Sequence, residues 1–183
     1  MRPAKKKMVA SLMPPLRSYG LILTLALAAT PAGAGELSPK MARMRCIVAD
    51  RLSQLQSNKA SKDRYLVVAR SDTDAYLQCL FLPNRTQLLC EAVSGFYQPG
   101  RPDMAGDKGR ALLAKNGFDT NFRNGNYQKM IALDANTSLN DVADLLMMLL
   151  RDVYGAQDTT PMKTVSSLIK RDDGAEARCS LTG

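Results

Sequence analysis

The stretch Ala75–Ser94 reads AYLQCLFLPNRTQLLCEAVS and decides the fold. Two runs rich in strand-forming residues flank the turn-forming tetrapeptide PNRT. This pattern predicts two antiparallel strands, Ala75–Leu82 and Gln87–Ser94. If the turn is centred in the middle of PNRT, the register of the hairpin places Cys79 directly opposite Cys90.

This register divides the hairpin into two faces, because successive side chains of a strand point in opposite directions. One face is apolar and predicts a core surface: Leu77, Cys79, Phe81, Leu88, Cys90 and Ala92. The other face mixes polar and apolar residues and supplies the candidate peptide contacts: Tyr76, Gln78, Leu80, Leu89, Glu91 and Val93. Two interpretations of the mixed face stay open, namely packing beneath the connection that follows Ser94 and binding of a partner.

The segment before the hairpin predicts a helix and a third strand. Ser38 followed by Pro39 is typical of a helix N-cap with proline at the first helical position. Apolar residues then recur at helical spacing to about Ser57: Met41, Met44, Val48, Leu52 and Leu55. Core packing is the favoured role of the two Met residues over a binding surface. Tyr65–Ala69 is a short β-type run, which makes a three-stranded meander with the hairpin.

The segment after the hairpin predicts a crossover with a short helix at Arg110–Lys115, then a second hairpin of Phe118–Phe122 and Asn126–Leu133. A final helix begins after Ser138, where Asp141 completes a pattern like a capping box. The expected fold class is therefore α+β, with an antiparallel sheet of meander plus hairpin packed by N-terminal and C-terminal helices.

The final helix contains Leu145–Leu150, six consecutive Leu or Met residues. Such a run is more apolar than a half-exposed helix requires. It is either buried on both sides within one chain, which we favour, or part of a subunit interface.

Three regions are predicted in total: a signal peptide at 1–34, one α+β domain at 35–156 and a polar tail at 157–183. Within the tail, Thr160–Pro161 is typical of a helix start. A short helix through Val165, Leu168 and Ile169 is therefore expected.

The first 34 residues have the three parts of a cleavable signal peptide. A basic segment without acidic residues precedes the apolar run Leu21–Ala29, and Ala32–Ala34 provides an A-x-A site. The apolar run has nine residues, far fewer than the roughly 20 needed to cross a bilayer. We therefore expect cleavage between Ala34 and Gly35, which leaves a periplasmic or secreted protein with no membrane association.

Removal of this segment changes the charge balance. The full chain has 25 Lys and Arg against 17 Asp and Glu, and five of the basic residues lie in the predicted signal. The remaining chain has 20 basic residues against 17 acidic ones and no basic stripe interleaved with aromatic residues. This composition argues against a nucleic-acid partner.

All four cysteines follow the predicted cleavage site, which favours disulfides, and three full pairings are allowed. Opposed residues of a hairpin are close enough for a Cys79–Cys90 bond. Cys46 lies roughly 200° around its helix from the apolar stripe, so it faces away from the sheet and is predicted to pair with Cys179. The alternative, that Cys79 and Cys90 are small buried apolar residues, stays open.

The sequence contains no histidine. This composition excludes Ser-His-Asp and Cys-His catalysis as well as His-ligated zinc. The motifs C-x-x-C, G-x-S-x-G, G-x-G-x-x-G and the P-loop are also absent. We therefore predict no catalytic, cofactor-binding or metal-ligating residues and no cofactor, and we expect a protein that is not an enzyme.

Four groups of segments resemble the YbjN-like and type III secretion chaperone-like domains, also called TY-chaperone domains. They are Tyr65–Arg70 with Ala75–Cys79, Cys90–Tyr97, Asn116–Phe118 with Gly125–Gln128, and Val142–Leu146 with Arg151–Gly155. The resemblance covers about Met41 to Ala156. It implies an α+β sandwich that holds peptide segments, often as a homodimer. The signal-like N-terminus, the four cysteines and the tail lie outside the family pattern.

The resulting hypothesis is an exported, non-catalytic, chaperone-like module that binds a peptide segment or partner protein. One alternative is a structural envelope component that binds one fixed partner through its apolar C-terminal helix. A remote alternative is a carboxylate-based hydrolase, which would need buried carboxylates with raised pKa values in a cleft.

Overall fold

The computed structural model describes residues 37–58, 64–98, 100, 103–121, 125–167 and 178–179. The chain divides into two units, Met1–Gly33 and Ala34–Gly183, and every described residue belongs to the second unit. The predicted signal peptide and its cleavage point between Ala34 and Gly35 lie outside the described residues.

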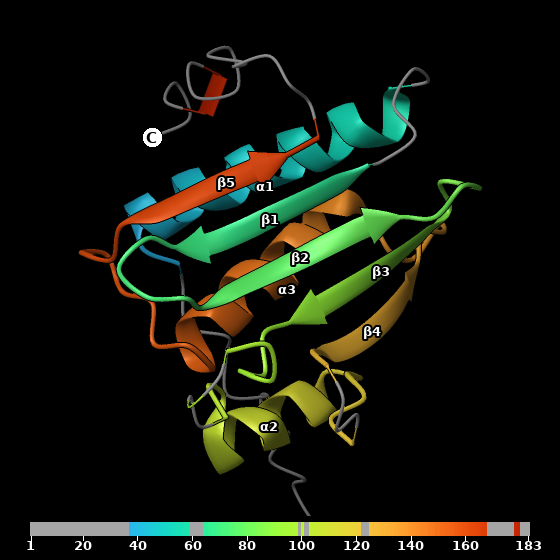
Figure 1. Cartoon of the computed structure of the whole chain (residues 1–183). Coiled ribbons are helices and arrows are strands. Elements are labelled where there is room, and N and C mark those ends of the chain that lie inside the picture. Colours follow the sequence, from blue (N-terminus) through green and yellow to red (C-terminus); the bar gives the residue numbers. More distant parts are fainter. Residues whose placement is uncertain are drawn as a thin grey trace, which may run out of the picture. The chain divides into compact units, whose positions relative to one another are not determined.

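The fold is α+β, with one five-stranded antiparallel sheet in the order β4-β3-β2-β1-β5 (Figure 1). The strands are β1 Tyr65–Arg70, β2 Tyr76–Phe81, β3 Gln87–Ala92, β4 Tyr127–Ala132 and β5 Met162–Ser166. The predicted meander is confirmed as β1, β2 and β3. Cys79 lies opposite Cys90, as the hairpin register predicts.

The helices are α1 Pro39–Ser57, α2 Gly106–Lys115 and α3 Leu139–Asp152. The predicted caps are confirmed: the Ser38 side chain accepts a hydrogen bond from the backbone N–H of Met41 at 3.3 Å, and Ser138 forms a reciprocal capping box with Asp141. Helices α1 and α3 lie on the same face of the sheet, whereas α2 lies beyond one end of it (Figure 1).

The core fills the space between this face of the sheet and helices α1 and α3. The strands contribute Leu66, Val68, Leu77, Cys79, Leu88, Cys90 and Ala92, and the helices contribute Val48, Leu52, Leu55, Leu146, Met147, Leu149 and Leu150; all of these are fully buried. The apolar run of α3 therefore serves the interior of the chain, as favoured from the sequence. Within this run, Leu145 was expected to be buried, but it is only partly buried, as is Met148.

The tail contains a second correction. Residues 162–166 form strand β5, which pairs with β1, where a short helix had been expected to begin. The odd-numbered residues of β1 direct their N–H and C=O groups toward the side where β5 lies, and β5 forms hydrogen bonds with them. A backbone bond from the Ser167 N–H to the Tyr65 carbonyl at 3.3 Å marks one end of this ladder. Leu168 and Ile169 lie outside the described residues.

The second predicted hairpin forms only in part. Its later strand is β4, but β4 pairs with β3 along its length. Of the expected earlier strand, Asp119 alone makes a bridge, to Gln128, and residues 122–124 are not described.

Both predicted cysteine pairs form disulfides. The hairpin disulfide, Cys79–Cys90, has a Cα–Cα distance of 4.1 Å and lies in the core. The tail disulfide, Cys46–Cys179, has a Cα–Cα distance of 5.7 Å and joins α1 to the end of the described chain. The backbone bond from Leu82 to Gln87 fixes the phase of the hairpin, so Cys79 and Cys90 are a non-hydrogen-bonded pair, the type with the closer Cα atoms.

Candidate functional site

The face of the sheet opposite α1 and α3 is covered by no described helix, and we call it the open face (Figure 1). Strand register and alternation assign its side chains. They are Tyr65, Val67 and Ala69 of β1, Tyr76, Gln78 and Leu80 of β2, Gln87, Leu89 and Glu91 of β3, Gln128, Met130 and Ala132 of β4, and Lys163 and Val165 of β5.

Four apolar side chains of the open face lie in one line across the strands. Tyr65 pairs with Leu80, Leu80 pairs with Leu89, and Leu89 pairs with Met130. The first three are partly exposed, and 52% of Met130 is exposed. This apolar row, 65–80–89–130, offers water-accessible hydrophobic surface that no described element covers.

A polar row runs beside the apolar row. Gln78, Glu91 and Gln128 lie opposite one another on β2, β3 and β4. The Gln78 amide donates to one Glu91 carboxylate oxygen at 3.1 Å, and the Gln128 amide donates to the other at 2.9 Å. Because a carboxylate has about four acceptor positions, Glu91 retains acceptor capacity toward a donor placed over the face.

On β1 and β5, the positions in line with the polar row are occupied by apolar residues. Val67 lies opposite both Gln78 and Val165, and 47% of Val165 is exposed. Apolar and polar side chains therefore alternate both along the strands and across them on the open face. This arrangement suits a ligand with both apolar side chains and hydrogen-bonding groups.

Five of the six contacts predicted from the hairpin share this face: Tyr76, Gln78, Leu80, Leu89 and Glu91. Tyr76 is partly buried and packs against the core, and its hydroxyl accepts a hydrogen bond from the Asn126 amide at 2.8 Å. The sixth, Val93, is not exposed on this face, although its N–H still bonds to the Tyr76 carbonyl at 3.2 Å across the hairpin. It follows the last residue of β3, has 3% of its surface exposed and belongs to the core, where its carbonyl accepts a bond from the Tyr154 hydroxyl at 2.7 Å.

The contributions of β1, β4 and β5 to the open face were not predicted from the sequence. The alternation of Tyr65 and Val67 with buried Leu66 and Val68 was visible in the sequence and could have found the β1 residues. Gln128 and Met130 needed the register between β3 and β4, which a long crossover separates. No local signal marked Val165.

A second cluster of titratable groups lies outside the open face. Burial raises the pKa of Tyr127 to about 12, and the neighbouring Asp103 carboxylate contributes to the rise. Burial likewise raises the pKa of Tyr154 above its ordinary value. Arg110 forms an ion pair with Asp103 at 2.8 Å. These contacts connect the crossover, α2 and β4, so we assign the cluster a structural role.

The lining of an open hollow of about 420 Å³ comes from the start of α1 and the segment after α3. Its charged groups are Arg151, which pairs with Asp152, and Asp158, which accepts a hydrogen bond from the Ser38 hydroxyl. No candidate residue predicted from the sequence lines it.

The described residues hold no cluster of three or more Cys, Asp or Glu side chains arranged for a metal ion. Among the helices of the described segments, none combines the length and hydropathy that a bilayer span requires. Among the described carboxyl groups, Asp72 and Asp141 have lowered pKa values: Asp72 accepts hydrogen bonds from Arg70, and Asp141 accepts hydrogen bonds from Ser138. Neither protein-family models, nor curated proteins, nor solved structures provide a match to this chain.

Proposed function

We propose that this protein is an exported, non-catalytic module that binds an extended peptide segment of a partner protein across the open face. The observation that carries the proposal is the pair of parallel rows on that face. The apolar row 65–80–89–130 can accept alternate apolar side chains of a peptide, and the polar row at Gln78, Glu91 and Gln128 can accept its hydrogen-bonding groups. Recognition of extended peptides generally combines hydrogen bonds, which give affinity, with pockets for alternate side chains, which give specificity.

The side chains proposed to bind the peptide are not needed to form the core. The core lies on the other face, and the open-face Met130 and Val165 are among the most exposed large apolar residues described. Exposed apolar groups rimmed by polar residues are typical of interaction sites. The resemblance to TY-chaperone domains supports the same class of ligand.

The alternative partner surface, the apolar run of α3, is mostly buried. The apolar helix proposed as a contact for one fixed envelope partner is α3, and four of the six residues in its apolar run are fully buried. Only Leu145 and Met148 reach the surface in part. We therefore favour the open face over α3 as the binding surface.

Binding is tested with Leu80→Asp combined with Leu89→Asp. These residues lie opposite each other on the open face, so two charges enter the middle of the apolar row. A matched control, Ser53→Asp with Ala111→Asp, adds the same charges at exposed positions of α1 and α2. Affinity for a pool of synthetic heptapeptides is measured by fluorescence anisotropy.

We expect peptide binding to the control and at least about a tenfold loss in the open-face variant. Side-chain amide NMR signals of Gln78 and Gln128 should also shift when peptide is added to the unmodified protein. Equal affinity of both variants, or binding without movement of these signals, would exclude the open face.

Export is the second part of the proposal. Its support is the signal-like segment 1–34 together with the two disulfides, which persist in oxidising compartments. Fractionation followed by N-terminal sequencing should recover a protein that begins at Gly35 outside the cytosol. Recovery of an intact Leu21–Ala29 segment in the mature form would contradict this expectation.

A further inference from the structure

Strand β5 is an edge strand made by the polar tail, and its side chains are little buried. None of its five residues is fully buried, and only Met162 packs against the core. Alternation assigns the peptide groups of Lys163, Val165 and Ser167 to the ladder with β1. The other peptide groups of β5 face outward.

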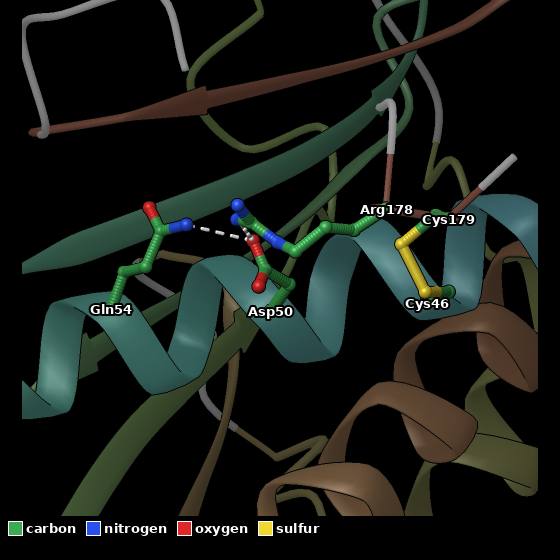
Figure 2. The surroundings of a disulfide bond; sticks show 5 residues. All are labelled: Cys46, Asp50, Gln54, Arg178 and Cys179. Atoms are coloured by element: carbon green, nitrogen blue, oxygen red, sulfur yellow. Dashed lines mark hydrogen bonds and ion pairs between the residues drawn. A yellow bond between two sulfur atoms is a disulfide. The ribbon is translucent and has the colours of Figure 1, made fainter. Parts of the chain in front are cut away.

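The end of the tail is fixed to α1 by a covalent bond. Cys46, Asp50 and Gln54 follow one another at intervals of four residues along one side of α1, and Arg178 and Cys179 lie against this side (Figure 2). The Asp50 carboxylate accepts hydrogen bonds from Gln54 at 2.7 Å and from Arg178 at 2.9 Å. Because Arg178 is largely exposed, this ion pair is weak, and the tail disulfide is the strongest attachment described there.

The two disulfides differ in their access to a reductant. Cys79 and Cys90 of the hairpin disulfide are completely buried. In the tail disulfide, Cys179 is also buried, with 4% of its surface exposed, but Cys46 is partly exposed and gives access to the bond. Thiol–disulfide exchange requires a thiolate to reach a sulfur atom. A small dithiol therefore reaches the tail disulfide first.

We propose that β5 is a built-in peptide that occupies the edge of β1, and that reduction of the tail disulfide makes this edge available to an extended segment of a partner chain. The edge of β1 is a different surface from the open face, so this proposal goes beyond the proposed function. The partner segment that fits has the alternation seen in β5, with small or flexible side chains toward the helices, as at Met162 and Thr164, and longer ones toward the open face, as at Lys163.

The chemical step is an exchange with a dithiol reductant. One of its thiolates attacks a sulfur of Cys46–Cys179 and forms a mixed disulfide, and its second thiol then closes a disulfide within the reductant. Cys46 and Cys179 leave as thiols, with two electrons and two protons transferred from the reductant. The tail is then covalently attached to the domain at one end only, through the segment that follows α3.

Release of one end raises the population in which β5 has left β1. While the bond is intact, an undocked β5 would still belong to a chain segment fixed at both ends, which restricts its conformations. Loss of such a restraint changes an opening equilibrium by a factor on the order of 10 to 100 for loops of this length. The edge of β1 then presents the peptide groups of Tyr65, Val67 and Ala69 to a competing strand.

The first test compares the oxidised protein with Cys46→Ser/Cys179→Ser, which keeps the hairpin disulfide, by residue-resolved amide hydrogen exchange. Strand β1 contains its own control. The amides of Val67 and Ala69 face β5, whereas those of Leu66, Val68 and Arg70 face β2. We expect exchange at Val67, Ala69, Lys163 and Val165 to become at least about tenfold faster in the variant, with no change at the amides that face β2.

The second test adds a labelled synthetic peptide with the sequence of residues 160–168, TPMKTVSSL, to both proteins. The peptide should bind the double-serine variant, and wild type treated with a dithiol, at least about tenfold more tightly than the oxidised protein. It should also restore slow exchange at Val67 and Ala69.

Three outcomes would overturn the proposal: exchange that does not differ between the proteins, peptide affinity that does not depend on the tail disulfide, and a dimer that exchanges β5 between copies in place of peptide binding. Leu80→Asp/Leu89→Asp separates this proposal from the proposed function. Those substitutions abolish binding across the open face and leave pairing of the peptide with β1 intact.

Discussion

The two faces of the sheet use the same strands for different purposes. On the face that packs against α1 and α3, Leu66, Leu77 and Leu88 have no exposed surface. On the open face, Leu80 and Leu89 come from the same strands and remain partly exposed. Side chains that differ by one position in the sequence are therefore separated into those that stabilise the domain and those that can meet a ligand.

The largest difference between the faces is expected for leucines of β2. Leu77→Ala should lower the free energy of unfolding by about 2–5 kcal/mol, because it leaves a cavity in the core. Leu80→Ala, on the open face of the same strand, should cost less than half as much, because its side chain already contacts solvent. Urea denaturation measures both losses, and equal losses would show that the open face is covered in solution.

The hairpin disulfide should contribute the next largest amount on the covered face. It closes a loop across a sequence separation of 11 residues, and replacement of both cysteines by alanine should lower the free energy of unfolding by about 3 kcal/mol. The same denaturation assay checks the value. A loss below about 1 kcal/mol would indicate that the pair is neutral for stability and acts only as small apolar residues.

Tyr127, on the covered side of β4, should make the free energy of unfolding depend on pH. The pKa of Tyr127 is about 12 in the folded protein and about 10 in an unfolded chain, so unfolding releases a proton between these pH values. The contribution of Tyr127 is complete below pH 10, and stability should fall by about 2–3 kcal/mol as the pH rises from 10 to 12. Tyr127→Phe should make this part of the stability profile less steep, and the remaining slope should come from Tyr154, whose pKa is also raised by burial. An unchanged profile would contradict the assignment.

The smallest effect is expected in the polar row of the open face. Glu91→Gln keeps the shape of the side chain and removes its charge, and cross-strand polar pairs contribute less than about 1 kcal/mol. Thermal unfolding should therefore shift only slightly, while affinity for peptides that carry a positive charge should decrease. A loss comparable to that of Leu77→Ala would mean that this row is structural.

The local parts of this fold could be predicted from sequence because their signals are local. The N-caps of α1 and α3 depend on residues within three positions of one another, and the register of the β2–β3 hairpin follows from its short turn. The pairing of Cys79 with Cys90 followed from that register, and the pairing of Cys46 with Cys179 followed from helical phase.

The errors arise where distant contacts override local pattern. Thr160–Pro161 has the chemistry of a helix start, yet the next residues form β5 because the edge of β1 offers them partners about 95 positions earlier in the chain. Val93 was a candidate peptide contact, but it is buried just past the end of β3, which favours the packing alternative that the sequence left open. Leu145 was expected to be buried, but α3 turns it toward the partly exposed side of the helix.

The order of the four cysteines has a consequence for how the protein matures. The two bonds are nested, with Cys79–Cys90 inside Cys46–Cys179, so the first cysteine to be synthesised must wait for the last. Cys79 becomes available to Cys46 long before Cys179 does, and premature oxidation between them would block the hairpin. Correct maturation therefore depends on early folding that buries Cys79 and Cys90 together, or on a disulfide isomerase that reopens the wrong bond.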